Sequence, residues 1–216
     1  MLKENRLEVS GPKPELFTPL SKTESGLFVV SPPSVLRIDE TYDDQVLEDV
    51  PFATEMNVEN IKLLFGKGII PKGPIIDIGC GAGMLVQKLK AIRYQAHGVE
   101  ILEKYGQDWV RRSIDQSCYI GNIEDVPGIR SDSFVLVTTR AFWDSAFGTD
   151  GKGGINDPEK CLKEISRIIQ PNGVYFAMSD NNRHFDELTE LAREVGLSEF
   201  QVTDVSTWYS RLFTKG

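Results

Sequence analysis

PIIDIGCGAG, the segment at residues 74–83, begins as a short apolar strand and continues into a turn with three glycines. Glycine at these positions lets the chain turn tightly and lets a ligand approach the backbone without a Cβ in the way. The dinucleotide-binding fingerprint needs glycine at its first, third and sixth places. Here Met84 stands at the sixth place, glycines fill the first, third and fifth, and Asp77 stands two residues before the first glycine. The segment predicts a ligand-binding turn between a strand and a helix.

Strands and helices alternate on the C-terminal side of this turn. The hydrophobic patterns predict helices over residues 84–93, 102–116, 157–169 and 185–195, and strands over 74–78, 96–100, 118–121, 133–139 and 174–179, with a turn at 171–173. Two further strand-like runs, at 199–205 and 208–213, are joined by a short polar connection that favours an antiparallel hairpin. The alternation predicts an α/β fold of the Rossmann-like kind. Its doubly wound, mostly parallel sheet would have seven strands, with the antiparallel hairpin at one edge.

The N-terminal third of the chain has a different character. Eight of the eleven prolines lie in the first 74 residues, and because proline fixes φ and lacks an N–H, this part is expected to be mostly extended or irregular. One helix is predicted over residues 54–65, where Val58, Ile61 and Leu64 share a face and Gly66 follows as a stop signal. We therefore expect an N-terminal extension, residues 1–72, that packs on a core domain, residues 73–216.

Composition and charge restrict the classes of partner. The formal net charge of −8 disfavours a nucleic-acid partner, because phosphate binding requires a basic face. The cysteines at 80, 118 and 161 have neither a metal-binding spacing nor the look of a disulfide framework, so we expect no metal and a reducing, cytoplasmic setting. No signal-peptide core or membrane-length apolar run is present, so no membrane partner is expected.

The glycine-rich segment resembles the first motif of the class I S-adenosylmethionine-dependent methyltransferases, which is an acid, any residue, and then Gly-x-Gly-x-Gly. Asp77 to Gly83 match this motif completely. The resemblance implies S-adenosyl-L-methionine as the cofactor and S-adenosyl-L-homocysteine as the product. It places the loop around Gly79, Cys80, Gly81 and Gly83 against the methionine part of the cofactor, with Asp77 reaching the methionine ammonium directly or through water.

Two further segments extend the resemblance toward the nucleoside. Glu100, 23 residues after Asp77, ends a predicted strand, and the resemblance assigns it and the adjacent Ile101 to the ribose. In the family an acid after the third strand accepts a hydrogen bond from the adenine amino group, and the next backbone N–H reaches the ring. Asn122 replaces that acid here, and an amide oxygen can still accept the bond. The nucleoside set is completed by Ile123 and Glu124. A plain asparagine turn is the alternative interpretation.

The segment after the fourth predicted strand, residues 138–144, departs from the usual family pattern. Thr139 and Arg140 are assigned to the cofactor site because ligands of open α/β sheets bind at the carboxyl ends of strands. Arg140 could instead meet an anionic acceptor or pair with a nearby acid. Phe142 and Trp143 either pack on the adenine or the acceptor, or belong to the core.

Methyl transfer needs a base only if the acceptor loses a proton. His184, in the loop expected after the fifth strand, and Asp144 are the candidates for this role, each with a plain surface position as the alternative. His97, within a predicted strand, is expected to be structural. The glycine-rich stretch at 148–154 is either a mobile lid over the acceptor or a solvated connection.

Four functions fit the pattern to different degrees. The first is methylation of a small-molecule acceptor, favoured by the acidic charge and the short chain, and the second is methylation of a protein or peptide, since an acidic face attracts a basic target. The third is a nicotinamide-dependent oxidoreductase, against which Met84 argues. The fourth is a chain that keeps the cofactor fold without this catalysis. The acceptor and the oligomeric state stay open.

Overall fold

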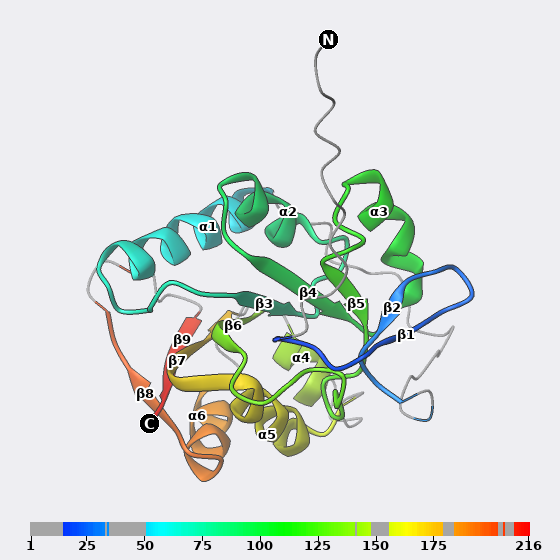
Figure 1. Ribbon diagram of the computed structural model, residues 1–216. Helices are drawn as coiled ribbons and strands as arrows, with labels where there is room; N and C mark the ends of the chain where they lie inside the picture. The colour runs from blue at the N-terminus through cyan, green and yellow to red at the C-terminus, as the bar shows by residue number, and fades with distance from the viewer. Residues whose placement is uncertain are drawn as a thin grey trace.

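One sheet organises the part of the chain that the computed structural model describes, which is residues 15–32, 34, 51–140, 142–147, 156–178, 184–202, 205 and 210–216. Its strands run in the order β1-β2-β5-β4-β3-β6-β7-β9-β8 (Figure 1). Their bounds are β1 Ser21–Lys22, β2 Phe28–Val29, β3 Ile75–Ile78, β4 Ala96–Glu100, β5 Cys118–Ile120, β6 Phe134–Arg140, β7 Ile169–Met178, β8 Leu197–Phe200 and β9 Ser210–Lys215.

The centre of this sheet is parallel, and each edge ends in an antiparallel pair. Strands β5, β4, β3, β6 and β7 pair in parallel, and β9 pairs antiparallel with both β7 and β8. These are the seven strands that the sequence predicts, and the antiparallel pair β8–β9 lies at the expected edge. The Rossmann-like α/β class is confirmed, and the short strands β1 and β2 are additions that the sequence did not predict.

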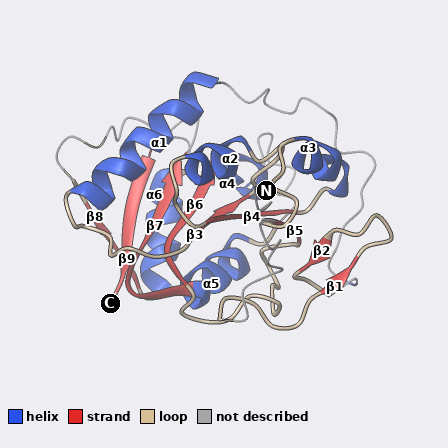
Figure 2. Ribbon diagram, turned by 45° about the horizontal axis from the view of Figure 1, so that its top comes forward, coloured by secondary structure: helices blue, strands red, loops and turns tan. Residues whose placement is uncertain are grey.

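Helices cover both faces of the sheet, as Figures 1 and 2 show. The helical elements are α1 Pro51–Gly66, α2 Met84–Ala91, the 3-10 turn η2 Glu103–Tyr105, α3 Gly106–Arg111, α4 Phe142–Phe147, α5 Pro158–Ile168 and α6 Phe185–Glu194. One hydrophobic cluster joins the sheet to α1, α2 and α3, and a second joins its other face to α4, α5 and α6. This two-sided burial explains the continuous apolar character of the central strands.

Several elements differ from the sequence prediction. Helix α4 was not predicted, and the strand expected over 199–205 is Leu197–Phe200. The helix expected over residues 102–116 is only η2 followed by α3, because Ser113 has a φ of 57° and a left-handed residue cannot continue a right-handed helix. The turn expected at residues 171–173 lies inside β7. There the pairing moves from Phe134–Ile169 to Leu136–Val174, so the Pro-Asn-Gly sequence forms a bulge within a longer strand.

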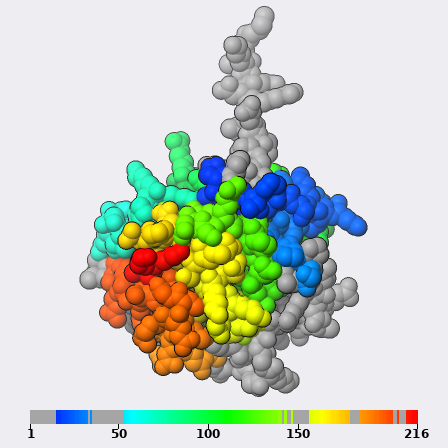
Figure 3. Space-filling view, turned by 60° about the horizontal axis from the view of Figure 1, so that its bottom comes forward, coloured from blue at the N-terminus to red at the C-terminus, as the bar shows by residue number. Residues whose placement is uncertain are grey.

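The described N-terminal residues lie along the free side of β5. Strand β2 pairs in parallel with β5 through Val29 and Ile120, and β1 pairs with β2. The Val30 N–H donates to the Ile120 carbonyl at 2.9 Å, and the Gly128 N–H donates to the Val30 carbonyl at 2.9 Å. Figure 3 shows this blue segment against green residues from the middle of the chain. Residues 15–31 are thus continuous with the main sheet.

A search of the described helices finds none with the length and apolar character needed to cross a membrane.

Candidate cofactor site

The glycine turn follows β3 at the carboxyl edge of the parallel strands. Gly79, Gly81 and Gly83 have φ values of 71°, 51° and 76°, a region that side-chain-bearing residues rarely adopt. A Cβ added to Gly81 would meet no atom within 4 Å, and one added to Gly79 would meet only the Phe142 ring, at 3.6 Å. A Cβ on Gly83 would lie 2.4 Å from Ile114 Cδ1. Gly81 therefore faces open space, Gly79 faces the Phe142 ring at van der Waals distance, and Gly83 permits close packing.

Asp77 lies within β3, directly before this turn, and is 6% exposed. The Thr138 hydroxyl of the neighbouring strand β6 donates to Asp77 Oδ1 at 2.7 Å. Thr138 and Asp77 are also register partners in the sheet. The pairing of the two strands therefore places the threonine hydroxyl beside the carboxylate that it binds. The sequence motif identifies the acid but carries no signal for its threonine partner.

The carboxylate of Glu100, at the end of β4, holds the glycine turn. Its Oε2 accepts a hydrogen bond from the Gly81 N–H at 3.0 Å, and its Oε1 accepts one from the Leu102 N–H at 3.1 Å. Burial raises the pKa of the Glu100 carboxyl above its ordinary value, and the backbone donors oppose this shift only in part. Each carboxylate oxygen has more than one lone-pair direction, so both can accept a further bond from a sugar hydroxyl.

Trp109 of α3 is a second support of the turn, and it is one that sequence reasoning missed. Its indole N–H donates to the Gly81 carbonyl at 2.8 Å, and the side chain is fully buried. Gly81 is thus held through its N–H by Glu100 and through its C=O by Trp109. Trp109 lies 28 positions after Gly81 in the sequence, so no local motif predicts this contact.

The loop after β5 presents Asn122 beside the same edge of the sheet. Asn122 Oδ1 accepts the Glu124 N–H at 3.1 Å, so the amide closes a short turn and is held in one orientation. Glu124 turns its carboxylate toward the start of α5, where Oε1 accepts the Asp157 N–H at 2.6 Å. The Ile123 side chain is buried in the core. The turn geometry agrees with the asparagine-turn interpretation.

Other predicted site residues have their side chains directed elsewhere. Cys80 is buried behind the turn, against Gly98 of β4, and burial raises the pKa of its thiol well above its ordinary value. The Thr139 hydroxyl is bonded to the Tyr175 hydroxyl at 2.8 Å inside the sheet. These two residues can meet a ligand only through their backbone. Ile101 directly follows β4 and is half-buried.

Several candidates lie at the ends of β6 and β7. Arg140, the last residue of β6, donates from Nη1 to the Thr54 hydroxyl of α1 at 3.4 Å. His184 stands at the start of α6, with Nδ1 3.1 Å from Glu187 Oε2. Asp144 belongs to α4, although its side chain is outside the described parts, as is the stretch at 148–154.

The aromatic and histidine side chains with structural alternatives lie in the core. Trp143 is buried and its indole N–H donates to the Tyr175 hydroxyl at 2.5 Å, which confirms its assignment to the core. Phe142 is only partly buried and packs against the same cluster. His97 is buried beside Phe17 and Tyr119, with Nδ1 3.2 Å from the Tyr119 hydroxyl, so its structural role is confirmed.

These residues fit the cofactor that the sequence motif implies. Open space lies over Gly81, a buried carboxylate stands at the end of β4, and an oriented amide follows β5. The three features are at neighbouring strand ends, which is where ligands of open α/β sheets bind. An elongated molecule with an amino-acid end, a ribose and a base would meet a complementary group at each position.

The comparisons with known proteins agree with this assignment. Residues 76–177 match a family model described as "Methyltransferase domain". The fold is similar to a TehB-like S-adenosylmethionine-dependent methyltransferase from Corynebacterium glutamicum, with a TM-score of 0.54 and 18% identity over 77% of this chain and 100% of that one. It is also similar to DesVI of Streptomyces venezuelae, with a TM-score of 0.58 and 11% identity over 76% of this chain and 94% of that one. The CcbJ methyltransferase from Streptomyces caelestis is similar as well, with a TM-score of 0.53 and 13% identity over 73% of this chain and 94% of that one. No curated protein sequence gives a significant match.

Proposed function

This chain contains a methyltransferase domain of the class I S-adenosylmethionine-dependent family, and we propose that it transfers the methyl group to a small-molecule acceptor. The observation that carries the proposal is the open space over Gly81, beside the buried carboxylate of Glu100. The following roles of individual residues belong to the same proposal.

The cofactor would be held by three strand ends. The turn around Gly79 and Gly81, with Asp77 behind it, would hold the methionine part, and Glu100 would accept hydrogen bonds from the ribose diol. Asn122 Oδ1 would accept from the adenine amino group, next to the backbone N–H of Ile123. When bound, S-adenosylmethionine supplies an electrophilic methyl group on its sulfonium. The residues around it then need mainly to align the acceptor, and such alignment contributes up to about 7–11 kcal/mol in favourable cases.

The acceptor side would be formed at the ends of β6 and β7. The register pairs Ile78 with Thr139, so Arg140, the last residue of β6, lies at the level of Gly79, which follows β3. A guanidinium at this place would attract an anionic group of the acceptor. His184, or Asp144, would take a proton where the acceptor must lose one.

A small acceptor is supported by charge. The formal net charge of −8 opposes a polyphosphate acceptor, because nucleic-acid binding depends on a basic face. The acidic charge also fits a basic peptide, which is why protein methylation is the second candidate. A small molecule and a basic peptide differ in size and not in the chemistry at the methyl group, so an experiment must distinguish these two acceptors.

Cofactor binding can be tested by calorimetry with S-adenosylhomocysteine and, separately, with NAD. We expect the first to bind and the second not to bind, and we expect Glu100→Ala to weaken S-adenosylhomocysteine binding by about 1–3 kcal/mol, since it removes a charged acceptor. Glu190→Ala, an exposed acid on α6, is the matched control and should leave the affinity unchanged. Binding of NAD alone, or unchanged affinity in Glu100→Ala, would contradict the proposed cofactor site.

The acceptor class can be tested by following S-adenosylhomocysteine release from S-adenosylmethionine. The enzyme would be offered separate pools of small amines, acids and hydroxyl compounds, of basic peptides, and of RNA. The proposal expects turnover with a small-molecule pool and a rate that falls in Arg140→Gln when the acceptor is anionic. Turnover with peptides or RNA only would overturn the small-molecule assignment and leave the cofactor site standing.

A further inference from the structure

The loop after β5 is held from two opposite sides by groups that no part of the cofactor motif includes. On one side, Ser31 Oγ accepts the Asn122 N–H at 2.9 Å and donates to the Asp125 carbonyl at 2.7 Å, with the Asn122 carbonyl at 3.2 Å. Ser31 is 5% exposed and Asn122 is 2% exposed. Ser31 directly follows the paired N-terminal segment and lies outside the matched methyltransferase domain, so a distant part of the chain reaches this loop.

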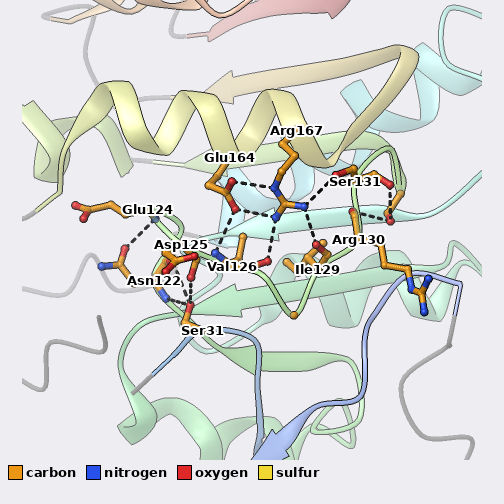
Figure 4. A network of polar contacts seen from close by, with 12 residues as sticks. Ser31, Asn122, Glu124, Asp125, Val126, Ile129, Arg130, Ser131, Glu164 and Arg167 are labelled. Atoms are coloured by element: carbon orange, nitrogen blue, oxygen red, sulfur yellow. Dashed lines mark hydrogen bonds and ion pairs between the residues drawn. The ribbon is translucent and has the colours of Figure 1, made fainter. Parts of the chain in front are cut away.

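On the other side, an ion pair of α5 holds the loop at Val126 and Ile129. Arg167 donates to the Val126 carbonyl at 3.0 Å and to the Ile129 carbonyl at 2.8 Å, while Glu164 Oε2 accepts the Val126 N–H at 3.2 Å. Arg167 and Glu164 are joined by two hydrogen bonds, at 2.7 and 2.8 Å. Figure 4 shows the guanidinium between the helix and the loop, with Ser31 at the far end of the same network.

The geometry of this pair is specific to arginine. One guanidinium meets a carboxylate and two backbone carbonyls at the same time, which its planar set of donors allows. The pair binds both the N–H and the C=O of Val126 and the C=O of Ile129. A shift of the loop along α5 would therefore break three hydrogen bonds. A lysine at this position would keep the charge but could not hold all three acceptors in this arrangement.

The two anchors enclose the residues that would face the base of the cofactor. Asn122 lies between Ser31 and the turn closed by the Glu124 N–H, and Val126 follows four residues later. Discrimination through a single hydrogen bond depends on holding the acceptor within about 0.5 Å of its productive position. A loop fixed at both ends meets this requirement, whereas a loop fixed at one end would sample other positions.

We propose that Ser31 and the Glu164–Arg167 pair are positioning residues for base recognition: they hold the Asn122 amide where it can distinguish adenine from a base that lacks the amino group. This inference rests on the proposed function, because it requires the adenosyl cofactor at this loop. It assigns to the N-terminal segment and to α5 a part in cofactor specificity, which the glycine motif alone does not provide.

The test compares two ligands by calorimetry, S-adenosylhomocysteine and S-inosylhomocysteine, in which a ring carbonyl replaces the adenine amino group. In the unaltered protein we expect a preference for the adenine form of about tenfold or more, because the Asn122 oxygen would otherwise face another acceptor. Ser31→Ala and Arg167→Lys should each lower the affinity for S-adenosylhomocysteine and reduce the preference to about threefold or less.

Ser21→Ala in the exposed strand β1 and Lys163→Gln on α5, whose side chain pairs with Glu159 at the surface, should leave the preference unchanged. Equal loss of affinity for both ligands in Ser31→Ala and Arg167→Lys would mean a purely structural role and would overturn the inference. So would binding of both ligands to the unaltered protein with equal affinity, although the cofactor site would then still stand. Failure of S-adenosylhomocysteine to bind at all would instead overturn the proposed function and the inference with it.

Discussion

The Glu100 carboxylate and the Gly81 N–H form a 3.0 Å hydrogen bond between the end of β4 and the turn after β3. This bond joins two groups that the family resemblance assigns to different parts of one ligand, the ribose and the methionine end. The carboxylate therefore has two tasks, to shape the turn and to present its remaining lone pairs to a sugar. Four predictions follow from this arrangement and from the residues around it.

The first prediction concerns pH. Burial raises the pKa of the Glu100 carboxyl above the 4.5 that is ordinary for glutamate. Because the ionised form is the one that accepts hydrogen bonds on both oxygens, S-adenosylhomocysteine affinity should fall as the pH is lowered, and the fall should begin above pH 4.5. Calorimetry in a series of buffers measures this dependence. Glu100→Gln cannot titrate and should bind weakly with no such fall; an unchanged pH profile in that variant would assign the titration to another group.

The second prediction separates the roles of the glycines. Gly83→Ala forces a Cβ against Ile114 at a φ of 76° and should lower the free energy of unfolding by about 2–5 kcal/mol. Gly81→Ala meets open space, so its cost in stability should be about 1–2 kcal/mol from φ alone. Its effect on S-adenosylhomocysteine binding should nevertheless be large, about tenfold or more, because the new methyl group enters the proposed ligand space. Urea unfolding and calorimetry on both variants test this contrast, which equal stability losses would contradict.

The third prediction concerns the indole that holds Gly81. Trp109→Phe keeps an aromatic ring in α3 but removes the donor to the Gly81 carbonyl, so the free energy of unfolding should fall by about 1–2 kcal/mol. Binding of S-adenosylhomocysteine should weaken as well, since the turn loses one of its two supports. Trp143→Phe is the control, because it also removes a buried indole hydrogen bond, to Tyr175. It should lower stability by a similar amount and leave ligand affinity unchanged. Equal effects of the two variants on affinity would argue against a specific role for Trp109.

The fourth prediction concerns the start of α5. Asp157 caps this helix, its Oδ1 accepting the Glu159 and Lys160 N–H groups at 3.1 and 3.2 Å. The Lys160 backbone N–H is the main reason why the pKa of the Asp157 carboxyl is lowered from its ordinary value of 3.8. The resulting stability is present above pH 3.8 and is lost as the pH falls through the lowered pKa.

Two substitutions of Asp157 distinguish the cap from the charge. Asp157→Ala should cost about 1 kcal/mol at neutral pH, whereas Asp157→Asn keeps a capping oxygen and should cost less. Urea unfolding at neutral and at acid pH measures both effects. Equal losses in the two variants would show that charge, and not capping, is the main contribution.

Local patterns predicted the elements that depend on local chemistry. The strand Ala96–Glu100 was predicted with the bounds observed, and all five of its residues are buried. The glycine turn was recognisable because its three glycines lie within five residues and because glycine is the residue that readily adopts the positive φ values found there. Helix α5 begins where it was predicted to begin, with Asp157 as its N-cap and Pro158 in the first turn, a combination that marks a helix start in sequence alone.

Contacts across long stretches of sequence could not be predicted in this way. Trp109 holding Gly81, Arg167 holding Val126 and Ser31 holding Asn122 each join residues at least 28 positions apart. None of them has a spacing or a composition that marks it. The helix after β4 was predicted too long because Ser113 has a φ of 57°, a left-handed conformation that the helical periodicity of the sequence does not reveal.

The pairing of β2 with β5 has a consequence for how the chain behaves when shortened. A strand at the border of a sheet offers unsatisfied backbone groups to any second molecule, and such borders are starting points for self-association. Removing residues 1–50 to isolate the methyltransferase domain would uncover the Ile120 carbonyl, which the Val30 N–H now occupies. A trimmed version of this enzyme is therefore expected to aggregate through the exposed border strand, and the loss of the buried Phe17 and Val30 side chains would weaken its core as well.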